Sequence, residues 1–226
     1  MTGKIYIVAT PIGNLGDITF RAIDTLKSVD AVLCEDTRMT GKLLNHYEIK
    51  KPLIRADAHT TQSTISKAIE LLQEGKNLAL VSDAGTPCIS DPGVFLIKEI
   101  IAHCGPETIV PIPGASAVIT ALCACGIPCS EFTFLGFLPH KKGRQSIFEQ
   151  IKQSDKVVVF YESTHRLKKT LVSLSEIMPE RHIVLAKELT KMHESFINGT
   201  AGEIIDYLDN NPKTEKGEFV LIVAPE

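Results

Sequence analysis

Short apolar runs, each about the length of a buried strand, recur along the first half of the chain. They cover residues 4–9, 31–34, 53–56, 78–81 and 108–112. Helical spacing of apolar residues between these runs predicts helices, for example over residues 62–74 and 94–103. Because the strands are apolar throughout and alternate with helices, this half predicts a parallel sheet covered by helices on both faces.

The second half has a different pattern, in which short strands adjoin without a helix between every pair. Strands are predicted over residues 132–135, 156–161, 182–186, 195–198 and 218–223. The last two are expected to pair with each other around a helix over residues 202–208, and the whole to form a mixed sheet. We therefore expect two α/β domains, residues 1–112 and residues 113–226.

The strand predicted over residues 78–81 leads into a loop that carries two carboxylates, Asp83 and Asp91. Asp91 stands where a helix N-cap belongs, and Pro92 stands at the first helical position. A loop of fixed shape after a buried strand is a common ligand position in open α/β sheets. It is also compatible with an ordinary rigid connection, and this stretch alone does not separate the two interpretations.

Polar or glycine-bearing segments follow several other predicted strands. They lie at residues 11–17, 35–38, 82–91, 113–117, 162–166 and 187–191. Since the carboxyl ends of parallel strands share one edge of a sheet, the first four segments should converge. Six such segments across two domains predict a crevice between the domains that binds a small molecule.

Composition narrows the classes of protein that the chain can represent. With 226 residues, 44% of them hydrophobic, and a net charge of −3, it is typical of a globular protein and not of a globally basic nucleic-acid binder. No apolar run approaches 18 residues and no signal peptide is recognisable, so we expect a cytoplasmic protein without a membrane partner. The six cysteines lack zinc-site spacing and are expected to be small buried side chains, with no metal site.

Familiar catalytic and nucleotide-binding motifs are missing from the sequence. There is no G-x-G-x-x-G and no G-x-x-x-x-G-K-[ST], so dinucleotide and P-loop sites lack their phosphate cradle. There is also no H-E-x-x-H or G-x-S-x-G. The chain has no tryptophan and only 6% aromatic residues, which argues against a broad base-stacking platform.

An ordered set of motifs carries a resemblance to a known family. The set consists of Thr-Pro-Ile-Gly-Asn at 10–14, Glu-Asp-Thr-Arg at 35–38, Ser-Asp-Ala-Gly-Thr-Pro at 82–87, Ser-Asp-Pro-Gly at 90–93, Pro-Gly-Ala-Ser-Ala at 113–117, Gly-Phe-Leu-Pro at 136–139, Phe-Tyr-Glu-Ser at 160–163 and Leu-Thr-Lys at 189–191. Over residues 4–223 the chain resembles the tetrapyrrole-methylase superfamily, and within it the branch of small-subunit ribosomal RNA cytidine 2′-O-methyltransferases. Family members usually carry a small extension after the last strand, which this sequence, ending at Glu226, does not include.

The resemblance implies S-adenosylmethionine bound between two α/β domains, usually in a homodimer, and small-subunit ribosomal RNA or the assembled small subunit as partner. Carried over position by position, it implies cofactor contacts at Ser82, Asp83, Ala84, Gly85, Thr86, Ser116, Ala117, Tyr161, Glu162 and Leu189. The residue types fit, because a carboxylate at Asp83 can accept hydrogen bonds from ribose hydroxyls. Gly85 also lets the backbone approach a ligand closely.

Transfer of a methyl group to a ribose hydroxyl depends mainly on positioning, with help from a nearby base or cation. Charged residues at the predicted strand ends supply the candidates, which are Glu35, Glu162, Lys187 and Lys191, with Asp36 and Glu188 beside them. An ion-pair network between the domains is an equally simple explanation of these charges.

Local basic runs at residues 140–144 and 165–169 are the expected contacts to RNA phosphates. The predicted RNA-binding residues are Asn14, Asp36, Arg38, Lys141, Lys142, Arg144, His165 and Arg166. A basic run can equally form a solvated helix face. Two other functions stay open at this point: the same fold methylating a tetrapyrrole precursor or a protein side chain, and a non-catalytic ribosome-binding protein.

Overall fold

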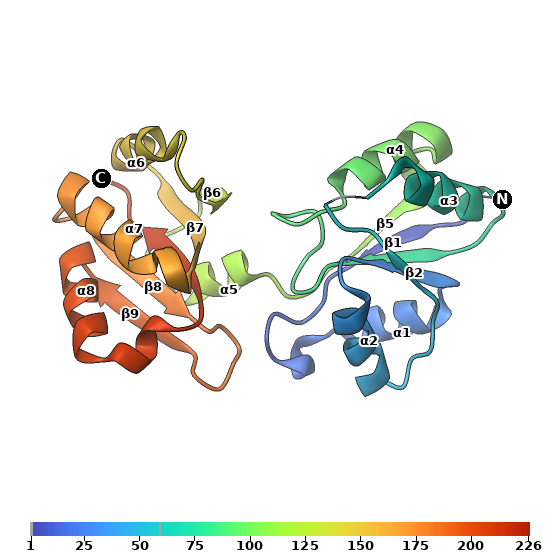
Figure 1. Cartoon of the computed structure of the whole chain (residues 1–226), viewed down its shortest axis with the longest axis horizontal. Coiled ribbons are helices and arrows are strands. Elements are labelled where there is room, and N and C mark those ends of the chain that lie inside the picture. Colours follow the sequence, from blue (N-terminus) through green and yellow to red (C-terminus); the bar gives the residue numbers. More distant parts are fainter. Residues whose placement is uncertain (1, 59) are drawn as a thin grey trace. The chain divides into compact units, whose positions relative to one another are not determined.

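The computed structural model describes residues 2–58 and 60–226, without the side chain of Lys213. Its described part forms two compact units, Met1–Ser116 and Ala117–Glu226 (Figure 1). Each unit contains one five-stranded sheet with its own helices. The sequence prediction placed the domain boundary after residue 112.

The sheet of the first unit is entirely parallel, as predicted. Its strands are β1 (Ile5–Val8), β2 (Ala31–Cys34), β3 (Leu53–Arg55), β4 (Leu78–Val81) and β5 (Ile109–Ile112). They are ordered β3-β2-β4-β1-β5, and every neighbouring pair runs in the same direction. The carboxyl ends of all five strands therefore lie along one edge of the sheet.

Helices cover both faces of this sheet (Figure 1). They are α1 (Phe20–Ser28), α2 (Thr37–His46), α3 (Gln62–Gln73) and α4 (Val94–Cys104), with short 3₁₀ turns at Leu15–Asp17 and Pro106–Thr108. Because side chains alternate along a strand, Leu80 packs with α3 and α4, whereas Ala79 and Val81 pack with α1 and α2. Both faces of β4 are thus buried, which explains its unbroken apolar sequence.

The sheet of the second unit is mixed, again as predicted. Its strands are β6 (Phe132–Phe137), β7 (Val157–Ser163), β8 (Ile183–Lys187), β9 (Ser195–Gly199) and β10 (Glu218–Val223). Their order is β6-β7-β10-β8-β9, with β6 parallel to β7 and all other pairs antiparallel. The predicted pairing of the last two strands is wrong, because β8 lies between β9 and β10 and binds both.

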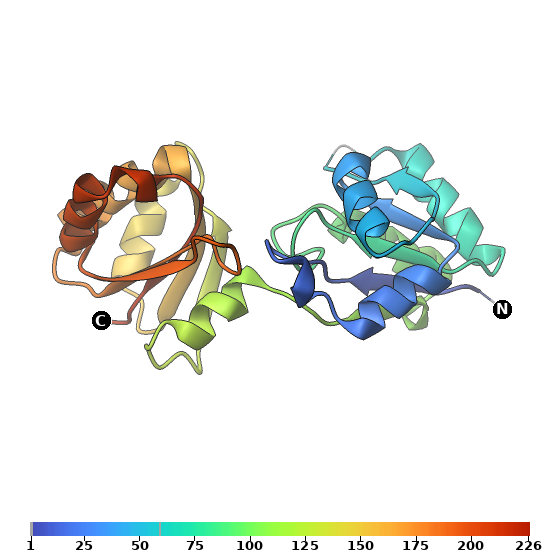
Figure 2. The same ribbon diagram turned by 90° about the horizontal axis from the view of Figure 1, so that it is seen from below.

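Four helices pack on the second sheet. They are α5 (Ala117–Ala124), α6 (Arg144–Lys152), α7 (Thr164–Ile177) and α8 (Ala201–Asn210), followed by a 3₁₀ turn at Pro212–Glu215. Residues of α6, α7 and α8 share one core with alternate residues of β7, β8 and β10. Helix α5 packs against β10 in the same unit (Figure 2).

Helix α4 begins at Val94, as predicted, but its N-cap differs from the prediction. Its N-cap is Gly93, at φ +120°, and no described side chain caps it. The prediction that Asp91 is the cap and Pro92 the first helical residue is therefore wrong. The preceding chain turns through left-handed backbone at Cys88 (φ 68°) and Ser90 (φ 63°), which directs Asp91 away from the helix end.

Two further observations concern membrane and metal sites. Within residues 2–58 and 60–226, no helix has the length and apolar character needed to cross a membrane. Across the same residues, no group of three or more His, Cys, Asp or Glu side chains is arranged to hold a metal ion. All six cysteines are free thiols, but the expectation that all are buried is wrong: Cys34 and Cys125 are buried, whereas Cys123 is exposed and the other three are intermediate.

Candidate functional site

Polar loops meet at the carboxyl edge of the first sheet, as the sequence predicted. The loop after β1 binds the loop after β4 through Thr10 and Gly85, whose backbone N–H groups each donate to the other's carbonyl, at 2.9 and 3.0 Å. The Thr86 hydroxyl donates to the carbonyl of Ala115 at 3.0 Å. The Asp36 N–H donates to the Asp83 carboxylate at 3.1 Å. Four strand ends are thereby connected into one surface.

Two glycines allow these loops to approach so closely. Gly85 has φ +83°, and a Cβ there would lie 3.3 Å from a methyl group of Ile12. At Gly114, an added Cβ would lie only 2.8 Å from the Cβ of Ala9, at the end of β1. A side chain at either position would force the loops apart, so this edge of the sheet depends on glycine.

Carboxylates concentrate at the same edge. Partial burial raises the pKa of Glu35, and the negative charges of Asp83 and Asp91 raise it further. Burial also raises the pKa of Asp91, against the opposing effect of a hydrogen bond with Ser82. Asp91 therefore interacts electrostatically with Glu35 and Asp83 and does not cap the helix as predicted.

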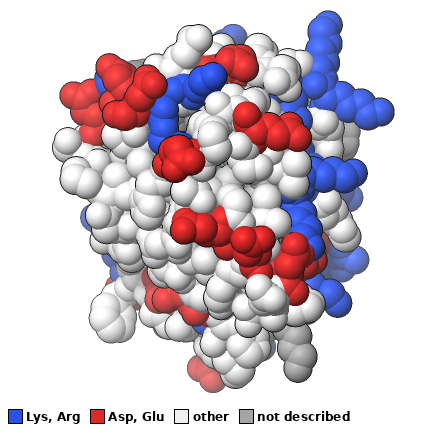
Figure 3. Space-filling model, turned by 90° about the vertical axis from the view of Figure 1, so that its left-hand side faces the viewer, with Lys and Arg blue, Asp and Glu red and all other residues white. Residues whose placement is uncertain are grey.

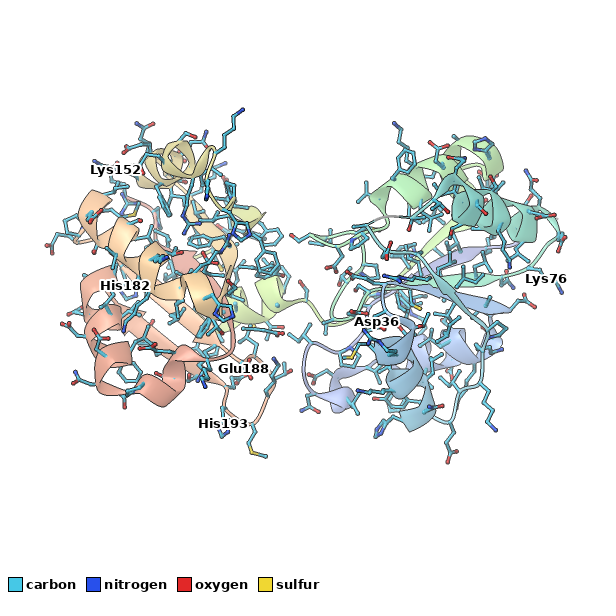
Figure 4. All side chains as sticks on the ribbon, viewed as in Figure 1. Asp36, Lys76, Lys152, His182, Glu188 and His193 are labelled. Atoms are coloured by element: carbon cyan, nitrogen blue, oxygen red, sulfur yellow. The ribbon has the colours of Figure 1, made fainter. Side chains whose placement is uncertain are left out.

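Asp36 is different from its carboxylate neighbours, because it is held by an arginine (Figure 4). It is the N-cap of α2 and accepts hydrogen bonds from the N–H and the guanidinium of Arg38. Those bonds keep the pKa of Asp36 well below its usual range. Asn14, another predicted RNA contact, caps the 3₁₀ turn after β1 by accepting from the Gly16 N–H at 3.0 Å.

Strained backbone is concentrated in the two loops that the sequence singled out. In the described chain, the non-glycine residues with positive φ are Glu48, Cys88, Ser90, Glu188 and Thr190. Two of them lie in the loop after β4 and two in the loop after β8. Left-handed non-glycine residues cost about 1 kcal/mol or more each and gather at ligand sites, which favours a functional role for both loops.

The end of β8 and the loop after it carry polar groups without partners among the described residues. Lys187 is 5% exposed, and its ammonium group makes no hydrogen bond or ion pair with any residue that the structure describes. The hydroxyl of Thr190 is buried and also lacks a hydrogen-bond partner among the described residues. Buried polar groups are normally satisfied, so the Thr190 hydroxyl, close in sequence to Lys187 at the end of β8, is a candidate ligand contact. Leu189, between them, is buried at 6% exposure.

Lys191 and Glu188, in the loop after β8, form an ion-pair network with Glu218 at the start of β10. Glu188 is labelled in Figure 4. The Lys191 ammonium lies 3.0 Å from Glu188 and 2.9 Å from Glu218. Burial acts to lower the pKa of Lys191, but its hydrogen bonds to the two carboxylates outweigh burial and the pKa is raised. Lys191 is thus a protonated side chain with two carboxylate partners, whereas Lys187 has no ion-pair partner among the described residues.

Glu162 is fully engaged by its neighbours. Its side chain is buried on the helical face of β7, where it accepts from Arg166 at 2.6 Å and from the Thr170 hydroxyl at 2.6 Å. The Arg144 guanidinium lies 3.5 Å away, and the Ser163 N–H donates at 2.8 Å. The sequence analysis proposed Glu162 as a catalytic and cofactor-binding residue, and Arg144 and Arg166 as RNA-binding residues. The structure brings all three together in one cluster.

The remaining predicted residues are placed as follows. The Tyr161 ring packs between Phe134 and Phe137, with ring centroids 5.0 and 5.2 Å away. His165, Lys141 and Lys142 are exposed, with His165 in the first turn of α7 and not in a loop. Ser116 and Ala117 lie at the junction of the two units, and Ser82 is buried beneath the loop that it opens.

Two residues with evident roles escaped the sequence analysis. Thr190 lies inside the Leu-Thr-Lys motif, but nothing in the sequence indicates that its hydroxyl lacks a partner. Thr170 lies in mid-helix, outside every motif, and is found only through its contacts with Glu162 and Arg144. The sequence pattern that could have identified Thr170 is its position four residues after Arg166, on the buried face of α7.

Residues 4–205 match the family of tetrapyrrole (corrin/porphyrin) methylases, so the chain belongs to that family. The curated relatives are more specific. The chain is 50% identical to a protein of Bacillus subtilis over 98% of its own length and 75% of the relative's. It is 48% identical to one of Haemophilus influenzae, covering 99% and 79%, and 44% identical to one of Thermotoga maritima, covering 98% of each. All three are named ribosomal RNA small subunit methyltransferase I.

Solved structures agree on the fold. The methyltransferase CobJ has a TM-score of 0.70 at 19% identity, covering 99% of this chain and 95% of that one. A diphthine synthase has a TM-score of 0.70 at 11% identity, covering 98% of this chain and 90% of that one. Uroporphyrin-III C-methyl transferase from Thermus thermophilus, complexed with S-adenyl homocysteine, gives 0.64 at 13% identity, covering 97% of each chain. Two α/β domains of this type are thus the architecture of the chain.

Proposed function

We propose that this protein transfers a methyl group from S-adenosylmethionine to the 2′-oxygen of a cytidine in small-subunit ribosomal RNA. The observation that carries the proposal is the 44–50% identity, over nearly the whole chain, to relatives named ribosomal RNA small subunit methyltransferase I. The tetrapyrrole and diphthine enzymes share the fold at only 11–20% identity. The cytidine and its 2′-oxygen rest on the motif resemblance, above all Thr-Pro-Ile-Gly-Asn and Glu-Asp-Thr-Arg.

The first unit has the features that a cofactor loop requires. Backbone at residues 84–86 and Ser116 is held at the sheet edge by glycines that leave room for a ligand. The exposed carboxylate of Asp83 has acceptor positions beyond its bond from Asp36, and these fit ribose hydroxyls or an ammonium group. In the second unit, taken by itself, the motif resemblance assigns Ala117, Tyr161 and Leu189 to the cofactor, and the Thr190 hydroxyl next to Leu189 is a buried polar group without a partner among the described residues. Bound S-adenosylmethionine supplies a methyl group on a cationic sulfur, a good leaving group.

Glu35 is the group that we propose accepts the proton of the 2′-hydroxyl. Its pKa is raised by burial and by Asp83 and Asp91, so its carboxylate holds a proton more readily than an exposed glutamate does. No described side chain donates a hydrogen bond to it or pairs with it. The other carboxylate candidate, Glu162, is occupied by two arginines and a threonine.

Lys187 is the cation that we propose stabilises negative charge on the attacking oxygen. Its ammonium has no partner in the described part of the chain and is only 5% exposed. A positive charge in a poorly solvated position favours an anionic oxygen more strongly than an exposed one does. Lys191 is a weaker candidate, because Glu188 and Glu218 already neutralise it.

A homodimer and a cytoplasmic location complete the proposal. Helix α4 exposes Val94, Phe95 and Ile101 at 60%, 57% and 40%, an apolar surface of the kind that subunit contacts cover. Assembled small ribosomal subunits, the proposed partner, are cytoplasmic. Sedimentation equilibrium should return twice the chain mass, and a monomer mass would contradict the dimer.

Transfer of tritium from methyl-labelled cofactor tests the reaction. The protein is incubated with small ribosomal subunits, with protein-free ribosomal RNA, and with a tetrapyrrole precursor. We expect label in the RNA fraction of the subunits. Label in ribosomal proteins or in the tetrapyrrole would replace the proposed substrate. Calorimetry that detects no cofactor binding would favour a non-catalytic ribosome-binding protein.

A further inference from the structure

A short basic loop joins β6 to α6 in the second unit. It comprises residues 138–143, Leu-Pro-His-Lys-Lys-Gly, and ends at Gly143, the N-cap of α6, at φ +82°. Lys141 and Lys142 are exposed, and neither pairs with a carboxylate of any residue that the structure describes. Lys and Arg side chains also gather along one edge of the face drawn in Figure 3, whereas the rest of that face is mostly uncharged, with separate groups of Asp and Glu.

Two arginines hold the main chain of this loop in place through hydrogen bonds to its carbonyl groups. Arg166, from α7, donates to the carbonyl of Leu138 at 2.8 Å. Arg144, from α6, donates to the carbonyl of Pro139 at 3.2 Å. Both arginine side chains are largely buried, at 15% and 16% exposure, and their hydrogen bonds go to groups of the protein. The planar fork of arginine suits it to hold several oxygens at once.

One carboxylate orients both arginines. Glu162 Oε1 accepts from Arg166 Nε at 2.6 Å, and Oε2 lies 3.5 Å from Arg144 Nη2. The Thr170 hydroxyl bridges the pair, accepting from Arg144 Nη2 at 2.5 Å and donating to Glu162 Oε2 at 2.6 Å. The Arg144 guanidinium also lies over the Phe148 ring, 5.0 Å from its centroid.

The charges of this cluster do not cancel. Two guanidinium groups surround one carboxylate, so the cluster leaves an excess of one positive charge beneath a loop that carries two free lysines. Poor solvation around buried groups makes that charge act over a longer range than a surface charge does. An anionic partner of the loop is thereby favoured.

We propose that loop 138–143 is a preformed phosphate clamp for the RNA backbone, in which Glu162, Arg144 and Arg166 are positioning residues. This inference rests on the proposed function, because it takes RNA as the substrate. Lys141 and Lys142 contact phosphates, and the cluster holds the loop in the binding conformation before RNA arrives. Arg144 and Arg166, expected from the sequence to touch RNA, act instead through the loop.

Substitution of Glu162 separates positioning from simple charge. Glu162→Gln removes a negative charge from beneath a basic loop, so a charge effect alone would tighten RNA binding. Loss of positioning has the opposite sign and weakens binding by about 3- to 10-fold. The measurement is fluorescence anisotropy of a labelled single-stranded RNA oligonucleotide, titrated with the full chain at several salt concentrations.

Further variants keep the test decisive if Glu162→Gln does not fold. Thr170→Val leaves every charge in place and removes only the bridging hydroxyl, so it should weaken binding without changing the salt dependence. The double variant Lys141→Ala and Lys142→Ala should lower the log–log salt slope by about 1.4. As a matched control, Lys168→Ala removes a lysine that Asp209 and Glu215 already pair, and should change affinity less than 2-fold.

The outcomes distinguish this inference from the proposed function, because RNA binding is measured without methyl transfer. An unchanged salt slope in the Lys141/Lys142 variant overturns the phosphate clamp even if the protein methylates RNA. Tighter binding by Glu162→Gln, or an effect of Lys168→Ala as large as that of the double variant, also overturns it. Absence of methylation by the wild-type chain overturns the proposed function and leaves the clamp to be judged on binding alone.

Discussion

Replacing Thr170 by valine should destabilise the second unit although the two side chains have nearly the same shape. The hydroxyl is completely buried and donates to Glu162 while accepting from Arg144. A hydrogen bond to a charged group contributes about 1.5–3 kcal/mol. Burial of the extra methyl group of valine offsets about 1 kcal/mol of this loss. With both charged partners disturbed, we expect the free energy of unfolding to fall by about 2 kcal/mol.

Thr170→Ser is the matched control, since it keeps the hydroxyl and removes one buried methyl group, for about 1 kcal/mol. Urea unfolding followed by circular dichroism gives both values, and hydrogen exchange at α7 amides localises the change to the second unit. The expected order of stability is wild type, then serine, then valine. A valine variant as stable as the serine variant would refute the view that the hydroxyl satisfies the buried charges.

Four further predictions concern the site. Glu35→Gln should stabilise the fold at neutral pH, because the raised pKa of Glu35 makes its charged form costly there. In the wild type, the contribution of Glu35 to the free energy of unfolding is complete below its unfolded pKa and is lost as the pH rises through its folded pKa. The same variant should abolish the acidic limb of the pH profile of kcat, and an unaltered limb would exclude Glu35 as the base. Lys187→Met should lower kcat by about 10²-fold while raising the urea midpoint, since it removes an unpaired buried charge, and a destabilised variant would contradict that account. Asp83→Ala should weaken cofactor binding in calorimetry more than Asp91→Asn does, and equal effects would argue against a direct contact from Asp83. Gly114→Ala should cost about 2 kcal/mol or more because of its clash with Ala9, which a chemical denaturation curve would detect.

Strand positions could be predicted from the sequence because burial imposes long apolar runs. Residues 31–34 and 78–81 were predicted with the same ends that the structure shows. Which strands pair in the second sheet was harder to predict from the sequence. The neighbours of β9 and β10 depend on β8, which lies between them in space although not in sequence. Apolar patterning marks which segments are strands but carries little information on which antiparallel neighbours they choose.

The start of α4 shows a second limit. Asp91 and Pro92 have the composition of a cap and a first turn, but the backbone reaches the helix through left-handed Cys88 and Ser90 and begins it at Val94. Neither residue type predicts positive φ, so the turn is set by tertiary contacts. The correction matters for function, because it places Asp91 with Glu35 and Asp83.

Glu162 could have been placed better from its sequence alone. Alternation along β7 puts it on the same face as Val158 and Phe160, which are core residues. A carboxylate on a core face needs partners, and Arg166, four residues on, is the nearest one along the chain. Arg144 comes from another helix, α6, so the complete cluster required the structure.

The most direct test of the proposed reaction is mass spectrometry of ribosomal RNA nucleosides. Small subunits from cells that lack this methylation are incubated with the protein and S-adenosylmethionine, and their RNA is digested to nucleosides. We predict a new 2′-O-methylcytidine in small-subunit RNA, absent when the cofactor is withheld. Methylation on the base, on large-subunit RNA only, or no new methylated nucleoside would contradict the central claim.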